Sequence, residues 1–261
     1  MLERNSPTVA IVNAKGGSGK TTTAVHLSVA LADRGYEVLA IDADAQHVLT
    51  RNLGVMPHHG THTVHDVLFG NLQAQEAAVE VRDRLRLVPA SLKMANVDVE
   101  LALGSAPDIR LRKGLRDRDW DICIIDCPPN LGKLTYNAMT AADYLLVPID
   151  SAYWALEGLD LLMDTADDVR SNYNPALRIL GAVLTRWDRT NVSRSVMEEV
   201  KARWPRETMS TVIRSSVKYR EAAALYETIF DNSNEELHAD YLRLMDEVLV
   251  RLGMVRDAVV K

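Results

Sequence analysis

Short apolar runs alternate with helix-length stretches along most of this 261-residue chain. The runs are bounded by Gly, Pro, Asp or Asn, and they therefore predict buried β-strands. They cover residues 9–12, 36–41, 85–88, 121–126, 144–149, 178–185 and 208–213. Strands that alternate with helices are typical of an α/β domain. The pattern predicts a mostly parallel, twisted sheet flanked by helices on both faces.

Apolar residues at helical spacing predict the intervening helices. These cover residues 20–34, 72–84, 91–118, 134–142, 191–203 and 235–252, and a further helix ends near residue 173. Gly35 is placed to end the first helix as a C-terminal cap. Thr61 or Thr63 is a suitable N-cap for a short helix that follows it, and Asn191 or Ser193 for the helix at 191–203.

The segment between the first predicted strand and the first helix, residues 13–23, reads NAKGGSGKTTT. Its glycines let backbone N–H groups face a phosphate, and the helix N-terminus adds partial positive charge. Lys20 would reach the β- and γ-phosphates, and the Thr21 hydroxyl would ligate Mg²⁺. Ala14 replaces the usual first glycine of the motif. The segment is a P-loop, and it predicts binding of a nucleoside triphosphate. The glycines are Gly16, Gly17 and Gly19.

Lys15 adds a second lysine to this loop, and the stretch KGGSGKT resembles the deviant Walker A signature of the ParA/MinD ATPases. Within that group the chain resembles the ParA/Soj type, the DNA-partition ATPases. The resemblance implies a P-loop NTPase fold, ATP and Mg²⁺ as ligands, and a Lys15 that reaches the partner's nucleotide across a dimer interface. The implied nucleotide contacts are Lys15, Gly16, Gly17, Ser18, Gly19, Lys20, Thr21, Thr22, Arg186 and Ile213.

Acidic residues follow two of the predicted strands, at the strand ends where ligands bind in open α/β sheets. Asp126 ends the strand DICIID before two prolines, an arrangement that resembles the Walker B strand, whose Asp holds Mg²⁺ through water. The segment from Asp42 to Gln46 resembles the family's D-x-D-P-Q motif, with Ala45 in place of proline. The match implies that Asp44 polarises or orients the attacking water, while Asp42 supports the loop and the metal shell. The catalytic residues implied are Lys15, Lys20 and Asp44, and the metal site comprises Thr21, Asp44 and Asp126.

Positive charge gathers in one part of an acidic chain. The chain carries a formal charge of −6, whereas residues 178–220 contain ten Arg or Lys and four Asp or Glu. A basic face on an acidic protein can steer DNA towards one side. The resemblance extends to the stretches 185–191 and 213–223, where relatives carry DNA-contacting arginines. It implies DNA contacts by Arg189, Arg214, Lys218 and Arg220, although Arg214 also replaces a proline that approaches the adenine in relatives.

The remaining features limit the class of protein. With 47% hydrophobic and 25% charged residues, the chain is an ordinary globular protein, expected as a single domain over residues 1–261. No run of about 18 apolar residues predicts a membrane span, and no signal core is present, so we expect a cytoplasmic protein. We also expect a flexible tail over residues 1–7 and no N-terminal helix-turn-helix domain. Cys123 and Cys127 are expected as core thiols. Four histidines within residues 58–65 do not favour a metal site, although that alternative remains open.

Together these features predict a slow ATPase that serves chromosome or plasmid partition. The resemblance implies an ATP-bound homodimer that binds double-stranded DNA without sequence preference on the nucleoid. A partner similar to the centromere-binding ParB would stimulate hydrolysis and release. One alternative is a ParA-like ATPase that positions a protein cargo on the nucleoid. A MinD-like membrane ATPase is disfavoured because the tail after residue 252 is short and poorly apolar. A third alternative is a scaffold that binds nucleotide without hydrolysing it.

Overall fold

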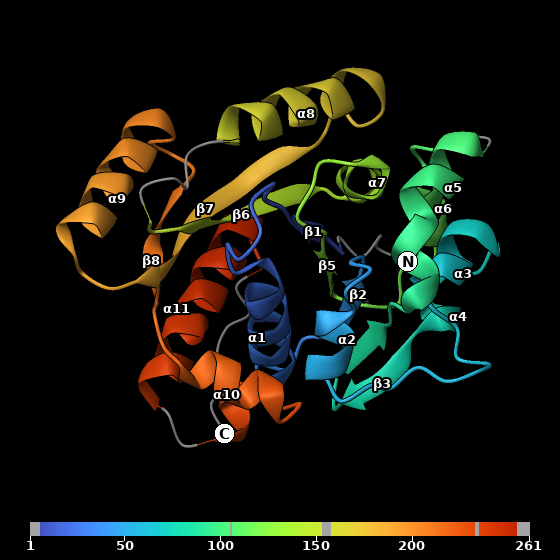
Figure 1. Cartoon of the computed structure of the whole chain (residues 1–261), viewed down its shortest axis with the longest axis horizontal. Helices are drawn as coiled ribbons and strands as arrows, with labels where there is room; N and C mark the ends of the chain where they lie inside the picture. The colour runs from blue at the N-terminus through green and yellow to red at the C-terminus, as the bar shows by residue number, and fades with distance from the viewer. Residues whose placement is uncertain (1–5, 105, 153–157, 233–234, 255–261) are drawn as a thin grey trace.

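The computed structural model describes residues 6–104, 106–152, 158–232 and 235–254. These residues contain an eight-stranded sheet in the order β3-β4-β2-β5-β1-β6-β7-β8, parallel throughout except at the β3–β4 edge (Figure 1). The fold class predicted from the sequence is confirmed. The strands are β1 (Thr8–Ile11), β2 (Val38–Asp42), β3 (Val79–Arg82), β4 (Leu85–Val88), β5 (Ile122–Asp126), β6 (Tyr144–Asp150), β7 (Arg178–Trp187) and β8 (Thr208–Arg214).

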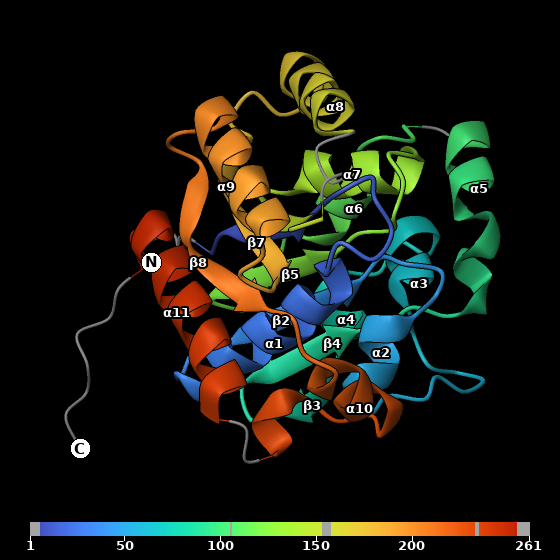
Figure 2. The same cartoon turned by 60° about the vertical axis from the view of Figure 1, so that its left-hand side comes forward.

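Two long helices cover one face of the sheet, α1 (Lys20–Asp33) and α11 (Glu235–Leu252). Figures 1 and 2 show them side by side against the central strands. Alternate residues of β1 divide between the two faces, because side chains in a strand alternate: Val9 and Ile11 pack with α1 and α11, and Ala10 faces the other side. The apolar stripe predicted for α11 is buried, with Leu252 only partly covered.

Short helices and the longer helices α7, α8 and α9 cover the opposite face (Figure 1). Trp120, fully buried just before β5, is the largest side chain of this second core. Both faces of the central strands are thus buried, which explains why these strands have unbroken apolar runs in the sequence. The helices on this side are α3 (Val64–Phe69), α4 (Ala74–Ala77), α5 (Val97–Leu103), α6 (Arg110–Gly114), α7 (Lys133–Ala141), α8 (Leu159–Asn172) and α9 (Asn191–Arg203).

The predictions for residues 72–84 and 91–118 need correction. The first range holds only the single turn α4 and then β3, the antiparallel edge strand. β3 alternates apolar Val with charged side chains, VEVR, because one of its sides faces water. The second range is broken into the 3-10 turn Leu92–Asn96 and the short helices α5 and α6. Three further elements are present that the sequence pattern does not predict: α2 (Val48–Asn52), α10 (Lys218–Ala224) and the 3-10 turn Ile229–Asp231.

Capping groups explain several helix ends. Gly35 has φ +95°, as expected of a helix C-terminal cap. Thr63 caps α3, where its side chain and that of Asp66 form a capping box. The predicted caps of α9 are wrong, because the Thr190 hydroxyl accepts the hydrogen bond from the Ser193 N–H and Asn191 is the first helical residue.

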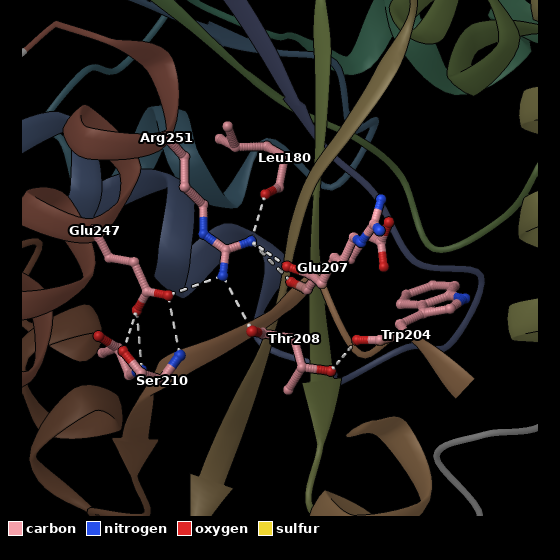
Figure 3. Close-up of polar contacts among 9 residues, drawn as sticks. Leu180, Trp204, Glu207, Thr208, Ser210, Glu247 and Arg251 are labelled. Atoms are coloured by element: carbon pink, nitrogen blue, oxygen red, sulfur yellow. Dashed lines mark hydrogen bonds and ion pairs between the residues drawn. The ribbon is translucent and has the colours of Figure 1, made fainter. Parts of the chain in front are cut away.

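The edge strand β8 is fastened to α11 by two charged side chains (Figure 3). Arg251 donates to the backbone carbonyl oxygens of Leu180, Glu207 and Thr208, and to the Glu247 carboxylate. Glu247 in turn accepts from Ser210 N–H at 3.0 Å. Since a lone edge strand has an unpaired side, these bonds secure it to the rest of the domain.

The chain start differs from the predicted tail. Ser6 is buried and donates to the Trp120 carbonyl oxygen at 2.6 Å, and the Pro7 carbonyl oxygen accepts from Cys123 N–H. The tail therefore does not include residues 6 and 7, and residues 1–5 lie outside the described part. Residues 153–157, which follow β6 and read YWALE, also lie outside it. Within the described ranges, no helix is long and apolar enough to cross a membrane.

Candidate nucleotide-binding site

The P-loop connects β1, at the centre of the sheet, to the N-terminus of α1. Asn13 begins the loop, donating to the Pro148 carbonyl oxygen at 2.8 Å and accepting from Lys15 N–H at 2.9 Å. Gly17 and Gly19 have φ +75° and +89°, a conformation that favours glycine. A Cβ at Gly19 would also lie 3.3 Å from Thr185. These constraints hold the loop open for a phosphate at the helix N-terminus.

The two lysines of the loop have different environments. The Lys20 side chain is buried, and its ammonium donates to the Lys15 carbonyl oxygen at 3.1 Å. Burial lowers the pKa of Lys20, while Asp126 acts in the opposite direction. The Lys20 ammonium therefore lies inside the loop, where a bound phosphate would replace the Lys15 carbonyl oxygen as its partner. Lys15, by contrast, is only half-buried.

Asp126 ends β5 opposite Asp42, the last residue of the neighbouring strand β2. It is fully buried, and neither of its carboxylate oxygens has a hydrogen bond of regular geometry within the described part of the chain. Burial, then the proximity of Asp42, raises the pKa of Asp126 well above its usual range, whereas the Thr21 hydroxyl favours the charged form. Unpaired carboxylate oxygens beside a P-loop threonine are suitable ligands for Mg²⁺. The residues present fit the predicted magnesium site.

Asp42 and Asp44 have different roles in the turn after β2. The buried Asp42 carboxylate accepts from Thr50 N–H, from the Thr50 hydroxyl and from Asp44 N–H at 2.8, 2.6 and 3.1 Å. Burial raises the pKa of Asp42 to about 6 despite these bonds. Asp42 thus supports the loop, as predicted. Asp44 is half-buried, accepts from Gln46 N–H and lines the same cleft as the P-loop, where the prediction places a residue that orients water.

The P-loop faces a cleft of about 490 Å³ with a second wall from the far end of the chain. Of the predicted nucleotide contacts, Gly16, Gly17, Gly19, Lys20, Thr21, Thr22, Arg186 and Ile213 line it. Ser18 is buried beneath the loop, and Lys15 is not part of the lining. The Arg186 guanidinium pairs with the Asp150 carboxylate at 3.2 Å, so the last residue of β6 orients a predicted nucleotide contact.

The predicted DNA contacts fall into two groups. Arg189 and Arg220 are exposed, and the described structure gives neither a carboxylate partner. Lys218 is exposed but pairs with Glu221 at 2.7 Å, and Arg214 pairs with Asp240 and Glu236. Arg189 follows β7 and Arg220 follows β8, and these two strands are parallel neighbours. Both residues therefore lie beyond the carboxyl ends of the strands, on the same side of the sheet as the P-loop. Arg214 is thus bound within the chain, and its DNA contact stays an untested prediction.

Several residues of the cleft were missed by sequence reasoning. Thr185, the residue next to Arg186, donates to the Ser18 carbonyl oxygen at 2.8 Å. Tyr219 and Tyr241 line the second wall. Tyr241 reads as part of the core stripe of α11, and no sequence signal distinguishes it from the stripe's other members. Thr185 lies in the stretch TRWDRTN, which resembles the family, but the resemblance assigns no role to Thr185 itself.

The two cysteines and the four histidines were also considered as ligands. Cys123 and Cys127 are both buried as free thiols, as predicted, and burial raises the pKa of each. His65 lies 3.0 Å from the Glu100 carboxylate. Across the described residues, no three His, Cys, Asp or Glu side chains converge as they would around a metal ion.

Comparison with known families places the site in context. The profile described as "AAA domain" matches residues 6–179, more than half of the chain. The chain is 43% identical to the "Chromosome partitioning protein ParA" of Caulobacter vibrioides over 199 residues, 74% of each protein. It is 38% identical to the "Chromosome-partitioning ATPase Soj" of Thermus thermophilus over 255 residues, 97% of this chain and 99% of that one.

A solved structure has a closely similar fold. It is described as cobyrinic acid a,c-diamide synthase from Mycobacterium smegmatis with bound ADP and magnesium. The TM-score is 0.83 at 31% identity, and the match covers 96% of this chain and 97% of that one. A fold of this kind therefore accommodates a nucleotide with magnesium.

Proposed function

Because the chain belongs to the ParA/Soj family of P-loop ATPases, we propose that it is a partition ATPase controlled by an ATP-dependent dimer. In this proposal the ATP-bound homodimer binds double-stranded DNA without sequence preference. Hydrolysis, stimulated by a centromere-binding partner similar to ParB, returns it to monomers. The replicon or cargo is determined by that partner. Binding to chromosomal DNA would place the protein on the nucleoid.

The observation that carries the proposal is that Lys20, Thr21 and Asp44 line one cleft, with the buried Asp126 carboxylate close enough to interact with all three. Lys20 and the loop N–H groups would hold the phosphates, and Asp44 would orient the attacking water. Thr21 and Asp126 would hold Mg²⁺, which neutralises charge on the phosphates when bound. A module that only binds nucleotide would not require the acidic pair beside the phosphate site.

Dimer formation and DNA binding rest on residues at the open side of this cleft. Lys15 is half-buried beside the phosphate site rather than within it, which suits a contact to a nucleotide held by a second copy. Arg189 and Arg220 are exposed at the same edge of the sheet. A dimer that joins the two clefts would bring two such edges together, and this explains why DNA affinity should depend on ATP.

The name of the solved relative suggests a different activity, the synthesis of a diamide. Two curated relatives with greater identity over most of their length are named for chromosome partition instead. The cleft is lined by the P-loop, by Asp44 and by residues around the end of β8, and this lining supplies what a bound nucleotide needs.

The decisive experiment measures binding to a random-sequence duplex with ATP, with ADP and without nucleotide, over a series of salt concentrations. We expect tight binding only with ATP, and a salt dependence that weakens in Arg189→Glu. On duplex DNA, each phosphate that the protein no longer neutralises lowers the slope of log affinity against log salt by about 0.9. Arg116→Glu is the matched control, because Arg116 is exposed and lies just after α6, on the side of the domain away from the cleft.

Three further outcomes would decide against parts of the proposal. An ATP-bound dimer without affinity for DNA would contradict the partition function and favour attachment to a membrane or to a protein scaffold. ATP binding without hydrolysis, and no difference between wild type and Asp44→Ala, would favour a scaffold that does not turn over. Equal losses of affinity in Arg189→Glu and Arg116→Glu would show a general charge effect instead of a DNA face.

A further inference from the structure

The cleft has two walls that come from opposite ends of the chain. The P-loop forms one, and residues that end β8 or follow it form the other, including Ile213, Arg214, Tyr219 and Arg220. A triphosphate bound on the P-loop leaves its nucleoside to contact the rest of the lining. The position of the second wall relative to the P-loop therefore determines how well the nucleoside fits.

Arg214 fastens this second wall to α11. Its backbone N–H and its Nε donate to the Asp240 carboxylate at 3.1 and 2.9 Å, and one terminal nitrogen donates to the other Asp240 oxygen at 3.1 Å. The second terminal nitrogen donates to the Glu236 carboxylate at 2.7 Å. Such bidentate, charge-assisted pairing fixes direction as well as distance. Two further contacts hold the wall after Arg214: Ser215 N–H donates to the Trp187 carbonyl oxygen, and the Tyr219 ring lies edge-on to the His26 and Tyr241 rings.

The acceptor of these bonds is rigid. Asp240 is 1% exposed, on a helix whose neighbouring residues Leu237, Tyr241 and Leu244 are buried in the core. A carboxylate in that position needs a cationic partner. Arg243 supplies a second one from the solvent side, and Arg243 is not among the residues that line the cleft.

The same part of α11 contacts the helix that starts at the P-loop. Tyr241, the residue after Asp240, stacks on the His26 ring of α1 with ring centroids 4.9 Å apart. His26 is buried and accepts a hydrogen bond from Ile229 N–H. Arg214 and Asp240 thus join the second wall, through Tyr241 and His26, to the helix that carries Lys20.

We propose that Arg214, held by Asp240, is a positioning residue that sets the cleft wall against which the nucleoside of the bound triphosphate packs. This inference rests on the proposed function in that it takes the ligand to be a nucleoside triphosphate. It gives Arg214 a role in nucleotide selection in place of a DNA contact. The guanidinium already faces two carboxylates, so little of its charge remains for a phosphate backbone.

The test compares two ligands that differ only by the nucleoside. The affinities of the full chain for ATP and for inorganic tripolyphosphate, each with Mg²⁺, are measured by calorimetry for wild type, Arg214→Ala and Arg243→Ala. We expect Arg214→Ala to weaken ATP binding about tenfold and tripolyphosphate binding by less than about twofold, because small misplacements of a positioning group are costly. Arg243→Ala removes the other partner of Asp240 and should leave both affinities unchanged.

The outcomes separate this proposal from the function on which it rests. If wild type binds neither ligand, the proposed ATPase function fails and Arg214 loses its role with it. If wild type binds both and Arg214→Ala weakens them equally, or leaves ATP unaffected, the positioning role is wrong while the ATPase function stands. At saturating ATP, Arg214→Ala should bind duplex DNA as wild type does. Weaker DNA binding by this variant would support the predicted contact between Arg214 and DNA. Arg214→Lys provides the same comparison with the charge retained, should the alanine variant lose its fold.

Discussion

The Thr185 hydroxyl donates to the Ser18 carbonyl oxygen at 2.8 Å, which joins the end of β7 to the floor of the P-loop. Thr185 is buried, and its side chain is also the nearest neighbour of Gly19. The phosphate-binding loop is therefore shaped by a residue that lies 167 positions further along the chain. The loop's geometry depends on this strand as well as on its own glycines.

Thr185→Val should weaken ATP binding about fivefold, because the isosteric change removes one hydrogen bond worth about 1 kcal/mol. Fluorescence titration with a labelled ATP measures the affinity. Thr165→Val is the control, since Thr165 also donates to a carbonyl oxygen, that of Leu161, but on the exposed side of α8. Equal affinities for wild type and Thr185→Val would show that the loop does not need this support.

Lys20→Ala and Lys15→Ala should separate binding from dimer formation. Loss of Lys20 removes a charge-assisted contact to the phosphates, so ATP affinity should fall by at least about tenfold. Lys15→Ala should keep its ATP affinity within about threefold but no longer form a dimer with ATP, as light scattering after size exclusion would report. A dimer of unchanged stability in Lys15→Ala would contradict the role of Lys15 across the interface.

Asp126→Asn should lose hydrolysis without losing stability. The buried carboxylate has unpaired oxygens, so its charge is a cost to the ligand-free fold and a benefit only when magnesium is present. We expect hydrolysis to fall on the order of 10–100-fold, while the melting temperature of the ligand-free protein does not decrease. Asp117→Asn, an exposed carboxylate, should change neither. Loss of stability in Asp126→Asn would indicate a structural role instead.

The stability of the ligand-free protein should carry a pH-dependent contribution from Asp42. Burial raises its pKa from 3.8 to about 6, so the folded state holds the proton more tightly than the unfolded state does. The contribution of Asp42 is therefore favourable below pH 4 and is lost as the pH rises to about 6, at a cost on the order of 1–3 kcal/mol.

Urea denaturation of wild type and Asp42→Asn at pH 4, 5, 6 and 7 tests this sign. Other carboxylates, such as Asp66 and Glu247, have lowered pKa values and act in the opposite direction, so the difference between the two proteins is the quantity to follow. The difference in unfolding free energy should move in favour of Asp42→Asn as the pH rises through this window. A difference independent of pH would contradict the assignment.

Arg251→Ala should destabilise the edge of the sheet. The guanidinium donates to several backbone carbonyl oxygens between β7 and β8 (Figure 3), and its removal leaves them without these partners. We expect a loss of about 2 kcal/mol in unfolding free energy. Arg34→Ala is the control, because Arg34 forms an exposed pair with Asp246 of the same helix as Arg251 and should cost less than about 0.5 kcal/mol. Equal losses would show that β8 is held by apolar packing alone.

The sequence by itself determined the parts of this protein that depend on neighbours along the chain. The P-loop is a contiguous strand, turn and helix start, so its glycines, Lys20 and Thr21 are recognisable together. The central strands are dry on both faces, and their unbroken apolar runs could be identified for the same reason. The amphipathic helices α9 and α11 have the bounds that their periodicity predicts. By contrast, β3 is an edge strand in which valines alternate with charged residues, and the prediction of a helix there is wrong.

Only the tertiary structure decided which distant residues meet. The parallel order of β5 and β2 puts Asp126 opposite Asp42, and neither oxygen of the buried Asp126 carboxylate has a hydrogen bond of regular geometry among the described residues. The packing of α11 against β8 pairs Arg214, a predicted DNA contact, with Asp240. It likewise makes Tyr241, one residue of an apolar stripe, a wall of the cleft. Residue type and spacing cannot distinguish a free arginine from a paired one, because the partner's position depends on how the whole chain packs.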